Sequence, residues 1–149
     1  MVGVSIDRAG GKVGVPYVEV AHDCGLIVNP DGVKNQVEGN VVQAISRALM
    51  EEVQFDFAGV TSLDWSGYPI LRFYDVPAEI AIPLTNRPDK PTVGAGEGTT
   101  TPVAAATPNA IGETPGRPRP RTLPPAPGIL DQINYHTPSA METGPRGRY

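Results

Sequence analysis

The chain has 149 residues, enough for one domain of ordinary size, and 40% of them are hydrophobic, so it can form a core. Its formal net charge of −4 gives no electrostatic reason to expect nucleic-acid binding. Cys24 is the single cysteine, which excludes an internal disulfide and leaves too few thiolates for a zinc or iron–sulfur site. No apolar run approaches membrane-spanning length, and no signal-peptide pattern is present.

The N-terminal segment predicts a β-hairpin. Val2, Val4 and Ile6 alternate with small or polar residues, as in a half-buried strand. A turn over residues 7–12 leads to a return strand over residues 13–20. Because the pattern starts directly in a strand, we expect the chain to be a piece of something larger.

An amphipathic helix is the longest element expected. Asn29 can cap the free N–H groups of a helix start, and Pro30 suits the first helical position. Gly39 lies inside this helix, where glycine costs about 1 kcal/mol against alanine, and this suggests a close approach by another backbone or a ligand. Apolar residues recur at helical spacing up to residues 51–52, namely Val33, Val37, Val41, Ala44, Ile45, Ala48 and Leu49.

Shorter elements follow the helix. Residues 55–57, 70–73 and 80–82 read as short strands. A second helix can begin at residues 103–106, but Pro108 would remove a hydrogen bond and clash with the preceding turn. We therefore expect an interruption there.

The composition changes at Gly112. Six prolines between residues 115 and 127 leave no room for a helix or a central strand. We expect an α+β domain over residues 1–111 and a disordered Pro-, Gly- and Arg-rich tail over residues 112–149.

A glycine-rich segment at residues 94–98 carries one carboxylate, Glu97. Glycine permits a close approach that a side chain would block, so Glu97 can be pressed against a bulky ligand as a proton acceptor. The alternative is a solvated loop carboxylate. Gln36 also has two interpretations. Its amide can donate and accept hydrogen bonds at a ligand, or it is an exposed helix residue.

Five short motifs in a fixed order connect these segments, and the match runs over residues 2–111. The order resembles the C-terminal part of the molybdopterin-binding large subunit of the xanthine dehydrogenase and aldehyde oxidase family, in particular isoquinoline 1-oxidoreductase-like beta subunits. The motifs are Cys24-Gly25, Asn29-Pro30, Gln36-Val37-Glu38-Gly39, Tyr68-Pro69-Ile70-Leu71-Arg72 and Gly94-Ala95-Gly96-Glu97.

The resemblance implies a molybdenum-dependent oxidoreductase that hydroxylates a carbon of an N-heterocycle or aldehyde with water. In this family a molybdenum ion held by a pterin dithiolene carries hydroxyl and sulfido ligands, and the motif glutamate takes the proton of the hydroxyl. By position Glu97 is this catalytic base, and Gln36, Gly94, Ala95 and Gly96 bind the cofactor. No residue of the chain is expected to ligate the metal itself.

The resemblance also implies molybdenum-molybdopterin, with the cytosine dinucleotide form as one option, and [2Fe–2S] clusters only on a partner subunit. The implied partners are the remainder of the molybdenum-binding subunit, an iron–sulfur subunit and a small aromatic heterocycle or aldehyde substrate. The implied location is the cytoplasm, with the periplasm open through a partner's signal. Family members are several times longer, so the chain is expected to be inactive alone.

Two other interpretations stay open. In the first, the chain is a truncated, catalytically silent remnant or an interaction module that uses its Arg/Pro tail. In the second, it is an unrelated small-molecule-binding domain.

Overall fold

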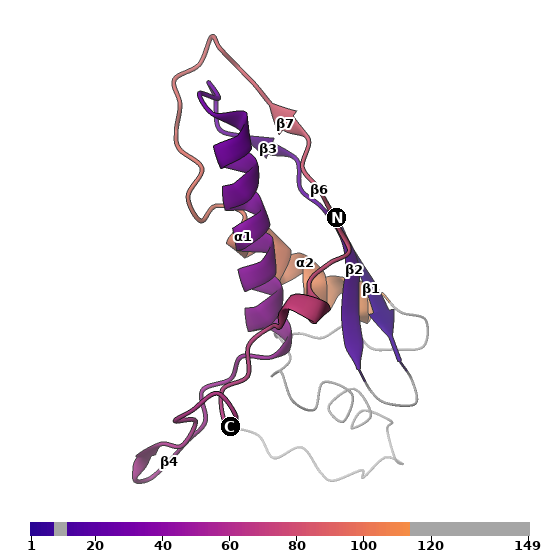
Figure 1. Cartoon of the computed structure of the whole chain (residues 1–149), viewed down its shortest axis with the longest axis vertical. Coiled ribbons are helices and arrows are strands. Elements are labelled where there is room, and N and C mark those ends of the chain that lie inside the picture. The colour runs from indigo at the N-terminus through magenta and orange to yellow at the C-terminus, as the bar shows by residue number, and fades with distance from the viewer. Residues whose placement is uncertain (8–11, 114–149) are drawn as a thin grey trace, which may run out of the picture.

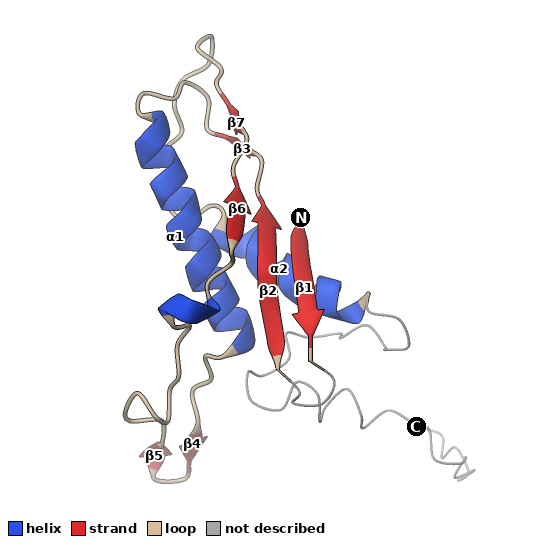
Figure 2. Ribbon diagram, turned by 45° about the vertical axis from the view of Figure 1, so that its right-hand side comes forward, coloured by secondary structure: helices blue, strands red, loops and turns tan. Residues whose placement is uncertain are grey.

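The computed structural model describes residues 1–7 and 12–113. Strands β1 (Val2–Ile6) and β2 (Val13–Glu19) form the predicted antiparallel hairpin. A third strand, β6 (Glu79–Ala81), lies parallel to β2, so the sheet has the order β1-β2-β6 (Figure 2). A parallel neighbour requires a crossover connection, and the long helix of the chain lies within that crossover.

This helix, α1, spans Pro30–Leu49 and confirms the longest predicted element. The side chain of Asn29 accepts a hydrogen bond from the backbone N–H of Gly32 at 3.0 Å, which is the predicted N-cap. The helix ends at Leu49, before the predicted residues 51–52.

A second helix, α2 (Thr100–Gly112), packs against α1 and β1 (Figure 1). The two helices and the sheet together enclose the hydrophobic core, so residues far apart in sequence stabilise each other through burial. The buried core cluster consists of Val15, Val18, Val37, Val41, Ala44, Ile45 and Val103.

The predicted interruption at Pro108 is wrong. Helix α2 continues through Pro108, which is buried, although proline provides no N–H for the preceding turn. The neighbouring Thr107 is fully buried, and its hydroxyl donates to the carbonyl oxygen of Val103 at 2.9 Å. Burial of this helix face, which also includes Ile111, offsets the lost backbone hydrogen bond.

A separate two-stranded ladder lies towards the end of the molecule where α1 begins (Figure 1). Strand β3 (His22–Asp23) pairs in parallel with β7 (Leu84–Thr85), and the N–H of His22 donates to the carbonyl oxygen of Pro83 at 3.1 Å. This ladder leads directly to the segments that precede α1 and the glycine-rich loop.

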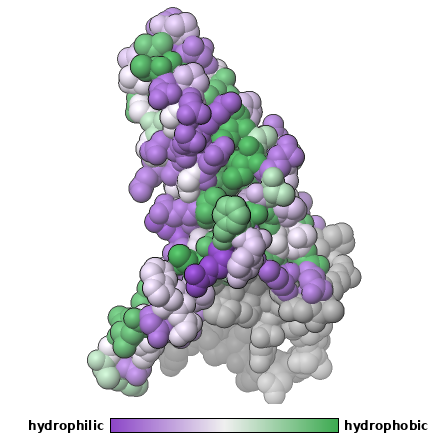
Figure 3. Space-filling model, viewed as in Figure 1, coloured by the Kyte–Doolittle hydropathy of each residue, from purple (hydrophilic) through white to green (hydrophobic). Residues whose placement is uncertain are grey.

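At the opposite end, the segment that follows α1 forms an arm that projects away from the helices and sheet (Figure 1). Its strands β4 (Phe55–Asp56) and β5 (Gly59–Val60) pair in antiparallel fashion, which confirms the short strand predicted at 55–57. Hydrophobic surface lies at the end of this arm (Figure 3). Its exposed large apolar residues are Val53, Phe55, Phe57, Val60, Leu63 and Trp65.

The strand predicted at residues 70–73 is not present, and Phe73–Asp75 forms a 3-10 helix instead. Side chains at the end of α1 hold this segment: the N–H of Leu71 donates to Ser46 Oγ at 3.0 Å. The hydroxyl of Tyr68 donates to Glu51 at 2.9 Å, and this hydrogen bond raises the pKa of Tyr68. The N–H of Leu71 thus has a side-chain partner in place of a neighbouring strand.

The predicted strand at 80–82 is confirmed as β6, shifted by one residue. Helix α2 runs through Gly112, one residue past the predicted domain boundary. Apart from residues 112 and 113, the predicted tail lies outside the described residues. Within the described part of the chain, no helix is both long enough and apolar enough to cross a membrane.

Candidate functional site

The site begins where the chain leaves β3 and runs alongside the glycine-rich loop. The carbonyl oxygen of Cys24 accepts a hydrogen bond from the N–H of Val93 at 3.0 Å. Gly25 has a φ of 78°, and a Cβ on it would lie 2.1 Å from the carbonyl oxygen of Pro91. Glycine is therefore required here for both the left-handed backbone and the close approach. These contacts attach the start of the loop to the segment that precedes α1.

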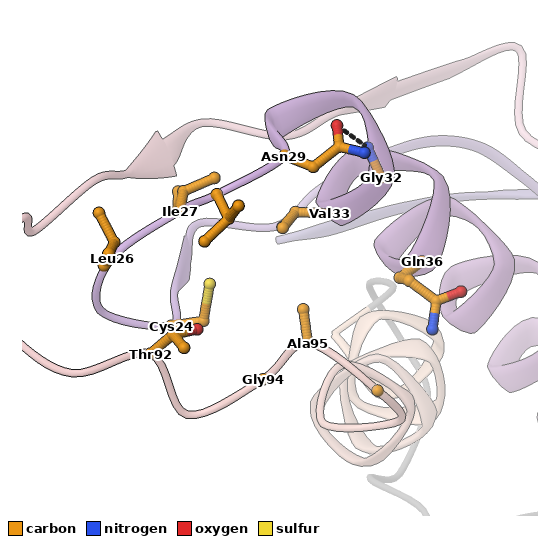
Figure 4. A pocket seen from close by; sticks show the side chains of 12 residues that line it. Cys24, Leu26, Ile27, Asn29, Gly32, Val33, Gln36, Thr92, Gly94 and Ala95 are labelled. Atoms are coloured by element: carbon orange, nitrogen blue, oxygen red, sulfur yellow. Dashed lines mark hydrogen bonds between the residues drawn. The ribbon is translucent and has the colours of Figure 1, made fainter.

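The cavity beside this junction has a volume of about 390 Å³. It brings together Gln36 from α1 and Gly94, Ala95 and Gly96 from the loop, the four predicted cofactor-binding residues. Figure 4 shows Gln36 and Ala95 on different sides of this space. The rest of the lining is mainly apolar and consists of Cys24, Leu26, Ile27, Val28, Asn29, Gly32, Val33 and Thr92.

The loop presents bare backbone to the cavity. Gly94 has a φ of 84°, a conformation that L side chains rarely adopt. A Cβ built on Gly94 or on Gly96 would meet no atom within 4 Å, so both positions border open space. Beside them the exposed amide of Gln36 can donate and accept hydrogen bonds. A flat, polar-edged group such as a pterin fits a site with backbone on one side and an amide on the other.

Glu97 follows this wall directly and does not line the cavity. Its side chain is exposed, and its backbone carbonyl accepts a hydrogen bond from the N–H of Thr100 at 3.0 Å at the start of α2. Glu97 thus follows a cavity-lining residue in sequence, and its side chain is open to solvent.

Sequence reasoning missed Asn40. Its side-chain nitrogen donates to the carbonyl oxygen of Gly96 at 2.6 Å, and the residue is only 8% exposed. Its position four residues after Gln36, on the same helix face, was a usable signal. Nothing in the sequence identified the loop as its partner. Cys24, which borders the cavity, is a free and buried cysteine.

In the described parts of the chain, no three His, Cys, Asp or Glu side chains come together in a group that could hold a metal ion. Whatever metal a ligand brings to this cavity would have to be held by the ligand or by residues outside these segments. An organic cofactor that holds its own metal, as a pterin dithiolene does, is compatible with this composition.

Comparison with known proteins defines the class of this fold and site. Residues 1–77 match the family model described as "Molybdopterin cofactor-binding domain". The chain therefore belongs to the family of molybdopterin-binding domains found in xanthine dehydrogenase-type oxidoreductases, as the motif order predicted.

Particular relatives agree. The chain is 46% identical over 113 residues to a nicotinate dehydrogenase subunit of Pseudomonas putida, a match that covers 76% of this chain and 9% of the relative. It is 33% identical over 137 residues to the beta subunit of isoquinoline 1-oxidoreductase from Brevundimonas diminuta, a match that covers 92% of this chain and 17% of the relative. The crystal structure of quinoline 2-oxidoreductase from Pseudomonas putida 86 superposes with a TM-score of 0.67 at 32% identity. The superposition covers 72% of this chain and 14% of that structure's chain. The chain thus spans less than a fifth of each relative.

Proposed function

We propose that this chain forms one wall of the molybdopterin site in a molybdenum hydroxylase, an enzyme that uses water to hydroxylate a carbon of an N-heterocycle or an aldehyde. The observation that carries the proposal is the cavity in which Gln36 meets Gly94, Ala95 and Gly96. Two segments about sixty residues apart in sequence converge there, and both match motifs of the family.

The loop glycines allow the cofactor to lie directly against the backbone at Gly94 and Gly96, because no Cβ intervenes. The amide of Gln36 orients the cofactor from the opposite side by donating and accepting hydrogen bonds. The apolar part of the lining, which includes Ile27 and Val33, excludes water and strengthens these polar contacts.

Glu97 acts as the base in this proposal: its carboxylate accepts the proton that water loses during hydroxylation. When bound, the cofactor supplies a redox-active metal centre that acidifies water and accepts electrons from the substrate carbon. The exposure of Glu97 in this chain is consistent with a wall that the remainder of the subunit covers.

The finer assignments extend this proposal. The cofactor proposed here is molybdenum-molybdopterin, with the cytosine dinucleotide form as one option, and the [2Fe–2S] clusters belong to a separate partner subunit. The two curated relatives are both named as subunits, which supports a multi-subunit assembly. Nicotinate, isoquinoline and quinoline, which appear in the names of the three similar proteins, are N-heterocycles, and we expect the same substrate class here.

A catalytically silent remnant is the second candidate. The position of Glu97 favours it, because the carboxylate is exposed and does not line the cavity. A remnant keeps the fold of the domain but binds no cofactor.

Metal and pterin analysis separates the two candidates. The chain is co-expressed with the products of the reading frames that flank its gene, and the resulting complex is called the assembled enzyme below. We expect the purified complex to contain stoichiometric molybdenum and releasable pterin. An intact complex without molybdenum, or a chain that enters no complex, would establish the remnant.

A further inference from the structure

We propose that Asn40 is the positioning residue for Glu97, holding the glycine-rich loop against α1 through the Gly96 carbonyl. The proposal rests on the assignment of Glu97 as the base. It concerns a contact within this chain, so it can be tested independently of catalysis.

The geometry of the contact is specific. The side-chain nitrogen of Asn40 lies 2.6 Å from the carbonyl oxygen of Gly96, at the short end of the usual range for such hydrogen bonds. Asn40 is 8% exposed, although most asparagines lie at the surface. A buried amide must be hydrogen-bonded to avoid a desolvation cost, so its partner on the loop explains its presence in α1.

Asn40 acts at a critical point of the loop. The start of the loop is fixed by the hydrogen bond from Val93 to Cys24, and its end by that from Thr100 to Glu97. Between them, three glycines flank the carboxylate and give the backbone more freedom than any other residue would. The clamp on Gly96 restrains the peptide unit that directly precedes Glu97.

The magnitudes show why one hydrogen bond matters here. Fixing the backbone of one residue costs entropy comparable in size to the net gain from one hydrogen bond. In a glycine loop held by a single hydrogen bond at its centre, the ordered and open conformations are therefore close in free energy. Removing that bond shifts the loop towards open conformations, in which the backbone that carries Glu97 is no longer held against α1.

Asn40 also couples the two sides of the cavity. It lies four residues after Gln36, so both side chains project from the same face of α1. Gln36 borders the cavity, and Asn40 holds the loop that forms its other side. One helix face thus sets the width of the site.

The test on the chain alone uses a protease that cleaves after glutamate. Asn40→Leu replaces the amide donor with an apolar side chain of similar size, and Asn35→Leu is the matched control at an exposed position of α1. We expect cleavage after Glu97 to rise about five- to tenfold in Asn40→Leu, the factor that corresponds to one net hydrogen bond. Cleavage after Glu38, within α1, should stay as slow as in the wild type.

Each outcome decides the question. An unchanged cleavage rate after Glu97 would overturn the clamp. Equal acceleration at Glu38 would also overturn it, because Asn40 would then support the helix and not the loop. Asn40→Asp, which keeps the size but presents an ionised acceptor, should reproduce the increase after Glu97 if Asn40→Leu fails to fold.

The assembled enzyme then separates positioning from the base assignment. We expect Asn40→Leu to lower kcat, measured per bound molybdenum, by about 10- to 100-fold with KM unchanged, because misplacing a catalytic group by about 1 Å costs this much. In a Glu97→Gln background Asn40→Leu should lower kcat no further. If Asn40→Leu keeps full kcat while Glu97→Gln is inactive, only the positioning role of Asn40 is overturned. If Glu97→Gln is active, the assignment of Glu97 as the base is overturned. The proteolysis experiment then decides alone whether Asn40 holds the loop.

Discussion

Replacing Glu97 with Gln in the assembled enzyme is expected to lower kcat by about 10²- to 10⁴-fold, the usual contribution of a general base. Glutamine keeps the size and polarity of the side chain but cannot accept a proton at neutral pH. Glu97 lies outside the cavity lining, so the cofactor should still bind. The measurement is the turnover rate per molybdenum, with metal content determined on the same sample.

Glu38→Gln is the matched control for this variant. Glu38 is also an exposed carboxylate, but it belongs to α1 and does not line the cavity. We expect its turnover to equal that of the wild type. Wild-type turnover in Glu97→Gln would remove the carboxylate from the mechanism, whatever the metal content.

The second large effect is expected for Gly25→Ala. Its φ of 78° is unfavourable for alanine, and the added Cβ would lie 2.1 Å from the Pro91 carbonyl oxygen. The obstacle is backbone, which cannot rotate away as a side chain can. Strain of this kind costs about 1–3 kcal/mol before the overlap is counted, so we expect a loss of about 3 kcal/mol or more in the free energy of unfolding. Urea denaturation of the 149-residue chain measures this loss.

Gly39→Ala is expected to stabilise the chain in the same urea experiment, in contrast to Gly25→Ala. Gly39 lies in α1, and a Cβ added to it would meet no atom within 4 Å, so alanine fits without strain. We expect a gain of about 0.5–1 kcal/mol in the free energy of unfolding, because alanine has less freedom to lose in a helix. Similar stabilities for the two variants would contradict the close approach at Gly25.

Helices and strands that are determined by residues close together in sequence were predictable from the sequence. Asn29 and Pro30 fixed the start of α1 through capping and proline geometry, and the alternating valines fixed β1. The end of α2 was not predictable, because Pro108 is unfavourable locally. Only its burial against the core, which a single sequence does not reveal, keeps the helix continuous.

The candidate site divides in the same way. Gln36 and the loop glycines were predicted from motif order, and the structure brings them to one cavity. Asn40 was missed because its partner is the carbonyl oxygen of Gly96, a backbone atom 56 residues away with no side-chain signature. Gly39 was expected to face another backbone or a ligand, and within the described residues no backbone comes near it.

Gly96→Leu in the assembled enzyme tests the central claim, that this cavity holds the cofactor, most directly. A Cβ on Gly96 would meet no atom within 4 Å, and Gly96 lines the cavity, so a larger side chain there competes with the cofactor for the same space. Gly98→Leu is the control, because Gly98 also has free space but does not line the cavity. We predict that Gly96→Leu loses most of its molybdenum and pterin while Gly98→Leu retains both, with equal far-UV circular dichroism. Full cofactor content in folded Gly96→Leu would contradict the assignment of this cavity.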